Sequence, residues 1–315
     1  MKTLRASSPV LDLPEDPVLA DEDSPRVVID NQRGTALVAR RRIGDILAEM
    51  LDLSAEQVQQ IANGARQRNL RFGEGAIQFG HASPGAVLAA LARQFDYPCM
   101  PDADPGVLTE LVMLSRPMSP QAEAVRAIRS QLLRRVFRAP GGGHALAVVS
   151  PDSGDGKTYL VANLAVALAQ TGERTVVLDA DLRHPRLHEV FGTDNTAGLS
   201  SLLLDGAYPA AVQAVQGVPG LFLLPAGTTP PNPLELIERA AFAHVLAQLV
   251  ERFDHVVVDT PAAIFGTDAQ VIAERCGAAV LVARRDGSRV ARLQALVDAL
   301  SDPPEALVGL VLNDF

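Results

Sequence analysis

The sequence predicts an α/β protein in which a mostly parallel sheet carries helices on both faces. From about residue 119 onwards, short and fully apolar segments alternate with helical segments, and such strands are typical of parallel sheets that are buried on both sides. A glycine-rich loop that ends in Lys157 and Thr158 lies between the first of these strands and a helix. This order of strand, loop and helix is the context of a phosphate-binding loop.

The size and composition of the chain restrict the class of protein. Its 315 residues exceed one mid-sized domain, and 48% of them are hydrophobic, which is enough for a buried core. The net charge of -9, with 4% aromatic residues and no tryptophan, argues against a nucleic-acid partner. No apolar run approaches the roughly 18 residues of a membrane span, and Cys99 and Cys276 lack disulfide or metal spacing. We therefore expect a cytoplasmic protein that reaches the membrane only through a partner.

Four regions follow one another along the chain. Residues 1–37 are rich in Pro, Asp and Glu, which predicts a disordered acidic tail. Apolar residues three and four apart predict a small helical module over 38–103. A stretch dense in proline precedes a predicted linker over 104–120. The α/β domain then occupies 121–315.

The helical module contains an internal repeat. The stretch RIGDIL begins at Arg42, and RFGEGA begins 29 residues later at Arg71. Each copy is followed by a serine in a helix-cap position, Ser54 or Ser83, and by an apolar helix. Two copies predict one pseudo-symmetric module.

The α/β domain begins with a predicted helix over 120–137. Fully apolar segments then predict its strands, with helical segments between most of them; the strands cover residues 145–150, 175–180, 221–226, 255–260, 278–283 and 307–313.

The loop between the first strand and its helix is suited to bind phosphate groups. Gly154 and Gly156 let the backbone curl so that successive N–H groups point inward. The start of the helix adds partial positive charge, Lys157 reaches the outer phosphates, and Thr158 is placed to ligate Mg²⁺. Pro151 stands where the usual pattern has its first glycine, so the alternative is a glycine-rich turn that only caps a helix.

Three carboxylates follow two other strands. Asp179 and Asp181 come at the end of one strand, and Asp259 ends another. The carboxyl ends of parallel strands are where ligands bind, although one such Asp alone more often caps a turn. Together with Thr158, the three acids predict a site for ATP and Mg²⁺.

These motifs resemble the Walker A, A′ and B motifs of the bacterial tyrosine kinases (BY-kinases) of capsule and exopolysaccharide synthesis. The resemblance covers about 119–315 and rests on the stretches SPDSGDGKT, VVLDADLRHPR, FDHVVVDTP and LLPAGTTPPNPLELI. It is greatest for cytoplasmic forms whose membrane activator is a separate chain. It implies a P-loop kinase fold, a role in polysaccharide polymerisation, chain length and export, and a membrane-embedded polysaccharide co-polymerase as partner at the inner membrane.

The resemblance also implies roles for individual residues. Lys157, Asp179 and Asp181 would be catalytic, with Asp179 as the base that orients the tyrosine hydroxyl. Mg²⁺ would be held by Thr158, Asp181 and Asp259. Arg183 either adds positive charge to the site or forms a structural ion pair. The implied ATP-binding residues are Ser153, Gly154, Asp155, Gly156, Lys157, Thr158, Tyr159 and Asn313.

An ExxRxxR pattern formed by Glu123, Arg126 and Arg129 matches the motif through which subunits of this family form a ring. The alternative is an exposed helix stabilised by its own charges. The family's tyrosine-rich carboxyl-terminal tail has no counterpart here, because the only tyrosines are Tyr97, Tyr159 and Tyr208. We therefore expect ATP binding and hydrolysis, with tyrosine phosphorylation directed to another protein or weak.

The repeated R-[IF]-G pattern resembles the amino-terminal domains of type II secretion ATPases, some of which bind cyclic di-GMP. The candidate residues for that ligand are Arg42, Gly44, Arg71, Gly73 and Gln94. Alanines replace several residues of the motif, including Ala65 and Ala76. We favour a docking module without nucleotide and keep the cyclic di-GMP site as the alternative.

Two other functions compete with the kinase. One is a MinD-like ATPase switch without tyrosine phosphorylation, but Pro151 and Asp152 stand where that branch carries an extra lysine. The other is a nucleotide-sensing scaffold without turnover. His184 and His188 lie four residues apart without a third ligand at metal spacing, so a zinc site is not expected.

Overall fold

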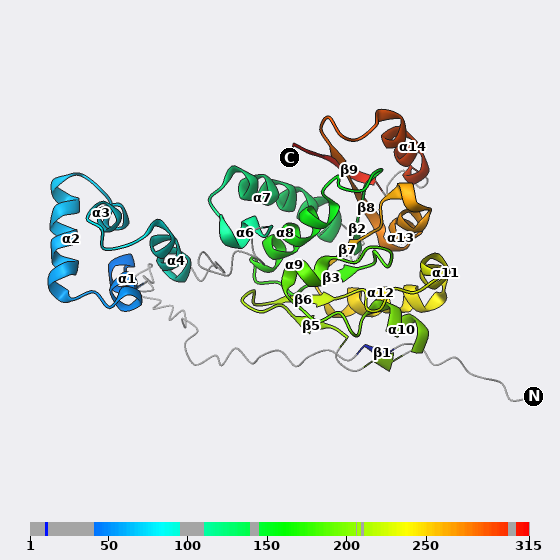
Figure 1. The fold of residues 1–315 in the computed structure, drawn as a ribbon, viewed down its shortest axis with the longest axis horizontal. Helices are drawn as coiled ribbons and strands as arrows, with labels where there is room; N and C mark the ends of the chain where they lie inside the picture. The colour runs from blue at the N-terminus through cyan, green and yellow to red at the C-terminus, as the bar shows by residue number, and fades with distance from the viewer. Residues whose placement is uncertain are drawn as a thin grey trace, which may run out of the picture. The chain divides into compact units, whose positions relative to one another are not determined.

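The computed structural model describes residues 10–11, 41–94, 110–138, 145–205, 207–208, 211–301 and 307–314. The chain forms two compact units (Figure 1). One comprises Glu15–Asp102, and the other comprises Met1–Pro14 with Ala103–Phe315. The division lies beside residue 103, at which the predicted helical module ends.

The smaller unit contains two similar helix pairs. Arg42 and Arg71 stand at the starts of the first helices of the two pairs, where Asp45 and Glu74 accept the arginines' backbone N–H groups at 3.3 and 2.8 Å. The second helices begin after a capping serine in each copy. The two copies of the repeat therefore share the same pattern of helix capping. The four helices are α1 (Ile43–Leu51), α2 (Ala55–Gln67), α3 (Phe72–Gln78) and α4 (Pro84–Gln94).

The two copies of the repeat pack against each other through equivalent residues. Gly44 of the first copy faces the ring of Phe72 in the second, and Gly73 of the second lies near Ile43 of the first. A Cβ at Gly73 would approach a methyl group of Val87 to 2.7 Å. Close packing therefore explains Gly73, whereas a Cβ at Gly44 would lie 3.4 Å from the ring of Phe72, an ordinary contact distance.

The larger unit is built on a seven-stranded sheet with the order β5-β6-β3-β7-β2-β8-β9. All pairs are parallel except that of β5 with β6, so the predicted fold class is confirmed. The short β5 was not expected from the sequence. The strands are β2 (Ala145–Val149), β3 (Thr175–Asp179), β5 (Gln213–Ala214), β6 (Leu221–Leu224), β7 (His255–Asp259), β8 (Gly277–Arg284) and β9 (Leu307–Asn313).

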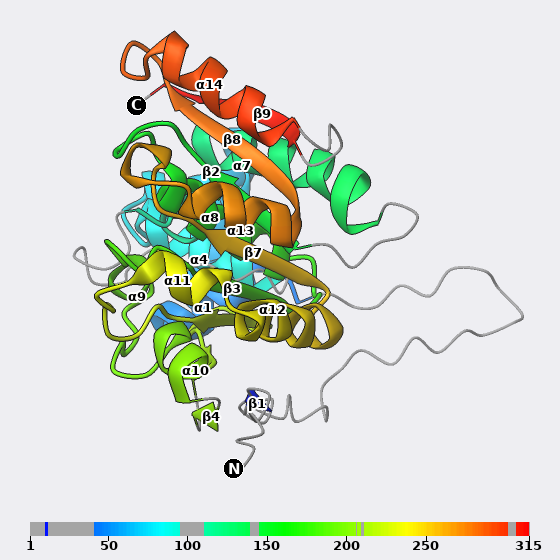
Figure 2. The same ribbon diagram turned by 90° about the vertical axis from the view of Figure 1, so that its right-hand side faces the viewer.

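Helices cover both faces of this sheet (Figure 2). The chain leaves β2 through α8 towards one edge of the sheet, whereas the connections after β6 run towards the other edge. Right-handed crossovers then place α8 opposite the later helices. Helix α8 (Lys157–Ala169) packs against α7 (Pro120–Leu132), which continues into a π-helical turn (Leu133–Phe137). The later helices are α11 (Pro233–Glu238), α12 (Ala240–Arg252), α13 (Asp268–Cys276) and α14 (Val290–Leu300).

Two segments differ from the predicted organisation. The predicted linker over 104–120 includes a short helix, α6 (Val112–Ser115), whose residues Val112, Met113 and Leu114 are buried. It is therefore packed structure rather than linker from about residue 110. In the predicted disordered tail, β1 (Val10–Leu11) pairs in parallel with β4 (Ala207–Tyr208). The other residues of the tail lie outside the described part of the chain.

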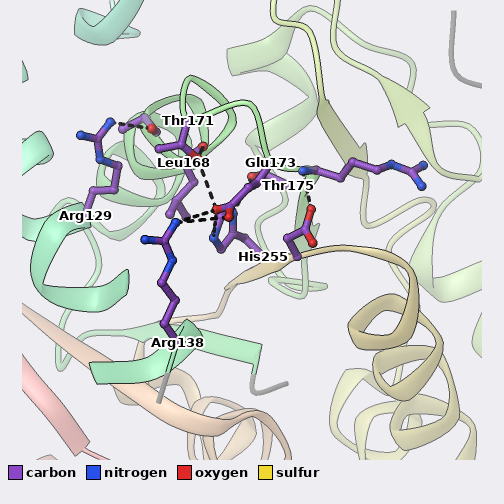
Figure 3. Close-up of polar contacts among 10 residues, drawn as sticks. Arg129, Arg138, Leu168, Thr171, Glu173, Thr175 and His255 are labelled. Carbon is purple, nitrogen blue, oxygen red and sulfur yellow. Dashed lines mark hydrogen bonds and ion pairs between the residues drawn. The ribbon is translucent and has the colours of Figure 1, made fainter. Parts of the chain in front are cut away.

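A polar cluster lies at the amino ends of β3 and β7 (Figure 3). The ring of His255 is 2% exposed and lies between Thr175 and Glu173, with 3.2 Å from Nδ1 to Thr175 Oγ1 and from Nε2 to Glu173 Oε2. Arg138, which follows the π-helical turn, donates to the carboxylate of Glu173. The cluster therefore links the π-helical turn after α7 to the edge of the sheet formed by the amino ends of the strands.

Candidate nucleotide-binding and phosphotransfer site

The glycine-rich loop turns sharply between β2 and α8. Gly154 and Gly156 have φ angles of +82° and +101°, a region that residues with a side chain rarely adopt. A Cβ at Gly156 would also lie 2.2 Å from the side-chain nitrogen of Asn313. The structure thus places both glycines where a phosphate-binding loop needs them.

Lys157 and Thr158 begin α8 and point towards different partners. Lys157 is 7% exposed and its ammonium group donates to Ser150 Oγ at 3.1 Å. The hydroxyl of Thr158 donates to Asp259 Oδ2 at 2.7 Å. The structure therefore joins the phosphate loop to the end of β7, as the sequence predicts.

Asp179 and Asp259 are direct neighbours in the sheet, paired in register across β3 and β7. Both are buried, at 0% and 1% exposure. Burial, with the nearby charge of Asp259 as the second cause, raises the pKa of Asp179 well above its usual value. Burial raises the pKa of Asp259 to about 6, against the opposing effect of Lys157. Two adjacent carboxyls that resist ionisation make a site suited to cations and to proton exchange.

The third acid, Asp181, lies in the turn that follows β3. Its Oδ1 accepts the backbone N–H groups of Arg183 and His184 at 3.2 and 2.9 Å. Its side chain is partly exposed. By contrast, Asp179 accepts three backbone N–H groups, from Asp181, Arg186 and Leu187. Asp181 is therefore the more accessible of the two to a ligand.

The phosphate loop is held by contacts that sequence reasoning missed. Asp155 accepts a hydrogen bond from Ser288 Oγ at 2.7 Å and one from the backbone N–H of Asp152 at 2.9 Å. Asp152 also forms an ion pair with Arg292 of α14. Asn313 donates to the carbonyl of Asp155 at 2.9 Å. No spacing in the sequence marks Ser288 or Arg292, because they lie more than a hundred residues from the loop.

Arg183 forms a structural ion pair. Its guanidinium group binds the carboxylate of Asp268 through two nitrogens, at 3.1 and 3.2 Å. Asp268 is 2% exposed. Of the two alternatives for Arg183, the structure therefore shows the ion pair, which joins the turn after β3 to the start of α13.

A hollow of about 530 Å³ opens beside the loop. It is bounded by α6, the loop and the end of β9, and among the predicted ATP-binding residues it includes Gly154, Tyr159 and Asn313. The exposed Ser153 lies in the loop itself. The hollow offers room next to the phosphate loop for the remainder of a nucleotide.

The acids and Thr158 fit a Mg²⁺ ion that shares its coordination with phosphate groups. Within the described residues, no three His, Cys, Asp or Glu side chains gather as a metal site. Mg²⁺ usually binds one or two carboxylates together with substrate phosphates and waters, rather than a cage of protein ligands. The donor set of Thr158, Asp181 and Asp259 is of that kind.

The predicted ring residues have partners within the chain. Arg126 donates to Glu123 Oε2 at 3.0 Å and to the carbonyl of Pro117. Arg129 donates to the carbonyl of Ala167, near the end of α8, at 3.0 Å (Figure 3). Glu123 remains exposed. These contacts support the helix and do not test the ring.

In the smaller unit, the repeat brings its motif residues close together. Arg42 and Arg71 are exposed. Gln94 donates from its side chain to the carbonyl of Arg41 at 3.0 Å. Gly44 and Gly73 lie in the packed contact described above, and the close approach of Val87 explains Gly73 without a ligand.

The fold and this site define the chain as a P-loop nucleotide-binding protein. The CobQ/CobB/MinD/ParA nucleotide binding domain matches residues 146–315, more than half of the chain. Among sequence relatives, the putative tyrosine-protein kinase CapB of Staphylococcus aureus is 34% identical, over 65% of this chain and 90% of CapB. The tyrosine-protein kinase YwqD of Bacillus subtilis is 31% identical, over 64% and 85%. The chain therefore belongs to the bacterial tyrosine-protein kinases, which are ATP-dependent phosphotransferases.

Solved structures agree with this assignment. The chimerical protein CapA2B2 has a TM-score of 0.61 and 33% identity, over 66% of this chain and 90% of that one. The kinase domain of the Escherichia coli tyrosine kinase ETK has a TM-score of 0.59 and 28% identity, over 64% and 79%. Other relatives are longer, and the chain spans only 28% of the tyrosine-protein kinase wzc of Salmonella typhimurium. Among the described helices, none has the length and apolar character needed to cross a membrane.

Proposed function

We propose that this chain is an ATP- and Mg²⁺-dependent protein-tyrosine kinase that regulates the polymerisation, export and chain length of a capsular polysaccharide or exopolysaccharide. One observation carries the chemistry. Asp179 and Asp259 are buried side by side at the carboxyl edge of the sheet, and Asp259 bonds to Thr158 of the phosphate loop. The charge of Lys157 also lowers the pKa of Asp259, which supports a shared site for phosphate and a cation.

Each residue has a role that its surroundings support. The loop amides and Lys157 bind the outer phosphates, which need positive charge and positioning. Thr158, Asp181 and Asp259 hold Mg²⁺, which supplies neutralisation of the charge on the phosphates when it is bound. Asp179 accepts the proton of the tyrosine hydroxyl, a role favoured by its raised pKa. Tyr159 and Asn313 border the nucleoside.

The partners that we propose for this chain are inferred from its family, because the structure contains a single chain. We propose that the chain is cytoplasmic, binds a membrane-embedded polysaccharide co-polymerase at the inner membrane, and forms a ring through Glu123, Arg126 and Arg129. The intramolecular bonds of both arginines must then be kept or exchanged on assembly. Mass measurement of the nucleotide-bound chain with its activator tests the ring.

A second candidate function is an ATPase switch without tyrosine phosphorylation. It is favoured by the small number of tyrosines in the chain. Tyr159 is only partly exposed, and burial raises its pKa. Tyr97 lies outside the described residues.

One experiment separates the two functions. The purified chain is incubated with ATP, Mg²⁺ and its membrane activator, phosphate release is followed, and phosphotyrosine is mapped by mass spectrometry. The kinase predicts phosphotyrosine on a partner or on the chain. Hydrolysis without any modified tyrosine would leave the ATPase function. Lys157→Met serves as control, and unchanged turnover in this variant contradicts the whole site.

For the smaller unit we propose a protein-docking module without nucleotide, because packing against Val87 explains Gly73 of its motif without a ligand. The alternative is a cyclic di-GMP site at Arg42, Gly44, Arg71, Gly73 and Gln94. Calorimetric titration of the full chain with cyclic di-GMP distinguishes the docking module from the cyclic di-GMP site. Binding that Arg71→Ala abolishes supports the alternative, whereas no heat at high concentration excludes it.

A further inference from the structure

An apolar surface that the phosphotransfer roles do not use lies beside the catalytic acids. It is formed by Ile264 and Phe265 in the 3₁₀ turn η2 (Ala263–Phe265), which are 50% and 43% exposed. The ring of His184 lies on that of Phe265, with the centroids 4.8 Å apart. We refer to Phe265 and His184, together with Ile264, which precedes Phe265 in the turn and also borders a hollow with Pro151 and Leu296, as the aromatic shelf.

The shelf is bonded to both sides of the phosphotransfer site. The backbone N–H groups of Ala263 and Ile264 donate to the carbonyls of Ser150 and Pro151 at the start of the phosphate loop, at 2.9 and 3.1 Å. On the other side, the backbone N–H of His184 donates to Asp181 Oδ1 at 2.9 Å. A molecule lying on the shelf is therefore next to Asp181 and to the phosphate loop.

The two segments of the shelf are also locked to each other. The ion pair between Arg183 and Asp268 joins the residue before His184 to the helix that follows η2. Gly266 closes the turn with a φ of +152°, and a Cβ there would approach the carboxylate of Asp268 to 2.8 Å. The exposure of Ile264 and Phe265 is thus imposed by a tightly bonded turn.

We propose that the aromatic shelf binds the phenol ring of the acceptor tyrosine and its apolar neighbours in a protein substrate. Aromatic rings pack favourably on one another in offset or edge-on arrangements, and exposed apolar groups at the mouth of a site mark where a ligand binds. A ring held there brings its hydroxyl towards Asp181 and Asp179. The shelf accordingly selects tyrosine over serine or threonine, which have no ring to pack.

This inference rests on the proposed kinase function and names the acceptor that it uses. In the reaction the tyrosine oxygen forms a bond to the γ-phosphorus, and the bond from that phosphorus to the β,γ-bridging oxygen breaks. ADP leaves with the electron pair of the broken bond. The hydroxyl proton passes to the carboxylate of Asp179. The shelf takes no part in these bond changes and only positions the ring.

The test measures acceptor binding separately from turnover. The full chain, with Mg²⁺ and a non-hydrolysable ATP analogue, is titrated with an uncharged peptide that carries one tyrosine, and with its phenylalanine and serine counterparts. We expect the two aromatic peptides to bind and the serine peptide to bind at least about fivefold more weakly, as loss of one aromatic contact implies. We expect each of the variants Phe265→Ala and Ile264→Ala to bind the tyrosine peptide about 5- to 20-fold more weakly than the wild-type chain. ATP hydrolysis without peptide should remain within about twofold of wild type.

Val290→Ala is the matched control, because Val290 is a 78% exposed apolar residue of α14 that has no place in the shelf. It should leave peptide binding unchanged. Equal binding of the serine peptide, unchanged binding in Phe265→Ala, or absence of binding to the wild-type chain overturns the shelf. So does a loss of self-association in Phe265→Ala with unchanged peptide binding, which would assign the surface to a second copy. If the peptide binds through Phe265 but receives no phosphate when ATP replaces the analogue, the shelf stands and the kinase function fails.

Discussion

Asp259 shows how a single buried carboxyl links the site to the stability of the chain. It is 1% exposed, and burial raises its pKa to about 6. A carboxyl whose pKa is higher in the folded state than in the unfolded state favours folding at low pH, and this contribution is lost as the pH rises through the folded pKa. Without a bound cation, the protein therefore carries an electrostatic strain at neutral pH, which the proposed Mg²⁺ would relieve.

Asp259→Asn should remove this strain. We expect the free energy of unfolding of the nucleotide-free chain at pH 7.5 to rise by roughly 2 kcal/mol, while nucleotide turnover falls sharply. The measurement is urea unfolding at pH 5 and pH 7.5 for both proteins. Wild type should lose more stability than the variant between these pH values, and parallel behaviour of the two would contradict the assignment.

Two features disfavour any side chain at position 156, namely the positive φ of Gly156 and the nearby side chain of Asn313. Gly156→Ala introduces a Cβ at a φ of +101° and 2.2 Å from the amide of Asn313. We expect ATP affinity to fall at least about tenfold, since the strain alone costs over 1 kcal/mol. Gly154→Ala shares the positive φ but has open space around its Cβ. Calorimetric titration with ATP should show the smaller loss in Gly154→Ala, and equal losses would mean that the contact with Asn313 is unimportant.

At the scale of elements, the segment between β8 and α14, together with the first turn of α14, shapes the phosphate loop. Ser288 donates to Asp155 and also accepts the backbone N–H of Arg284 at 2.7 Å. Arg292 adds the ion pair with Asp152. The loop is thereby positioned by an element that has no nucleotide-binding motif of its own.

Ser288→Ala should leave Asp155 without one of its partners. Loss of a hydrogen bond to a charged group costs about 1.5 to 3 kcal/mol, so we expect ATP to bind about tenfold more weakly. Ser301→Ala is the control, since its hydroxyl donates to the carbonyl of Val297 at the end of α14. Fluorescence titration with a nucleotide analogue gives both affinities. Similar affinities in the two variants would show that the loop keeps its shape without Ser288.

At the scale of the whole molecule, the division into two units permits a further prediction. Among the described residues, the contacts reported above for the site lie within the unit that contains Ala103–Phe315. A chain that begins at Ala103 should therefore bind ATP with an affinity within about threefold of the full chain, less than 1 kcal/mol. Calorimetric titration of both proteins checks this. A loss of a hundredfold or more would show that the first 102 residues complete the site.

The parts of this molecule that could be predicted are those with a local pattern. The strands before Ser150, Asp181 and Thr260 are short apolar runs, and parallel strands bring their carboxyl ends to one edge. The paired burial of Asp179 and Asp259 follows from that rule. What could not be predicted depends on contacts distant in the sequence, such as Ser288 with Asp155 or Arg183 with Asp268. The buried α6 was missed because prolines nearby indicated a linker.

The contact between Asn313 and the loop has a consequence for how the protein is made. Asn313 ends β9, which emerges from the ribosome after every other strand of the sheet. Until then the carbonyl of Asp155 lacks this partner. A nascent chain therefore gains this contact of its phosphate loop only after β9, the last strand of the described sheet, has been synthesised.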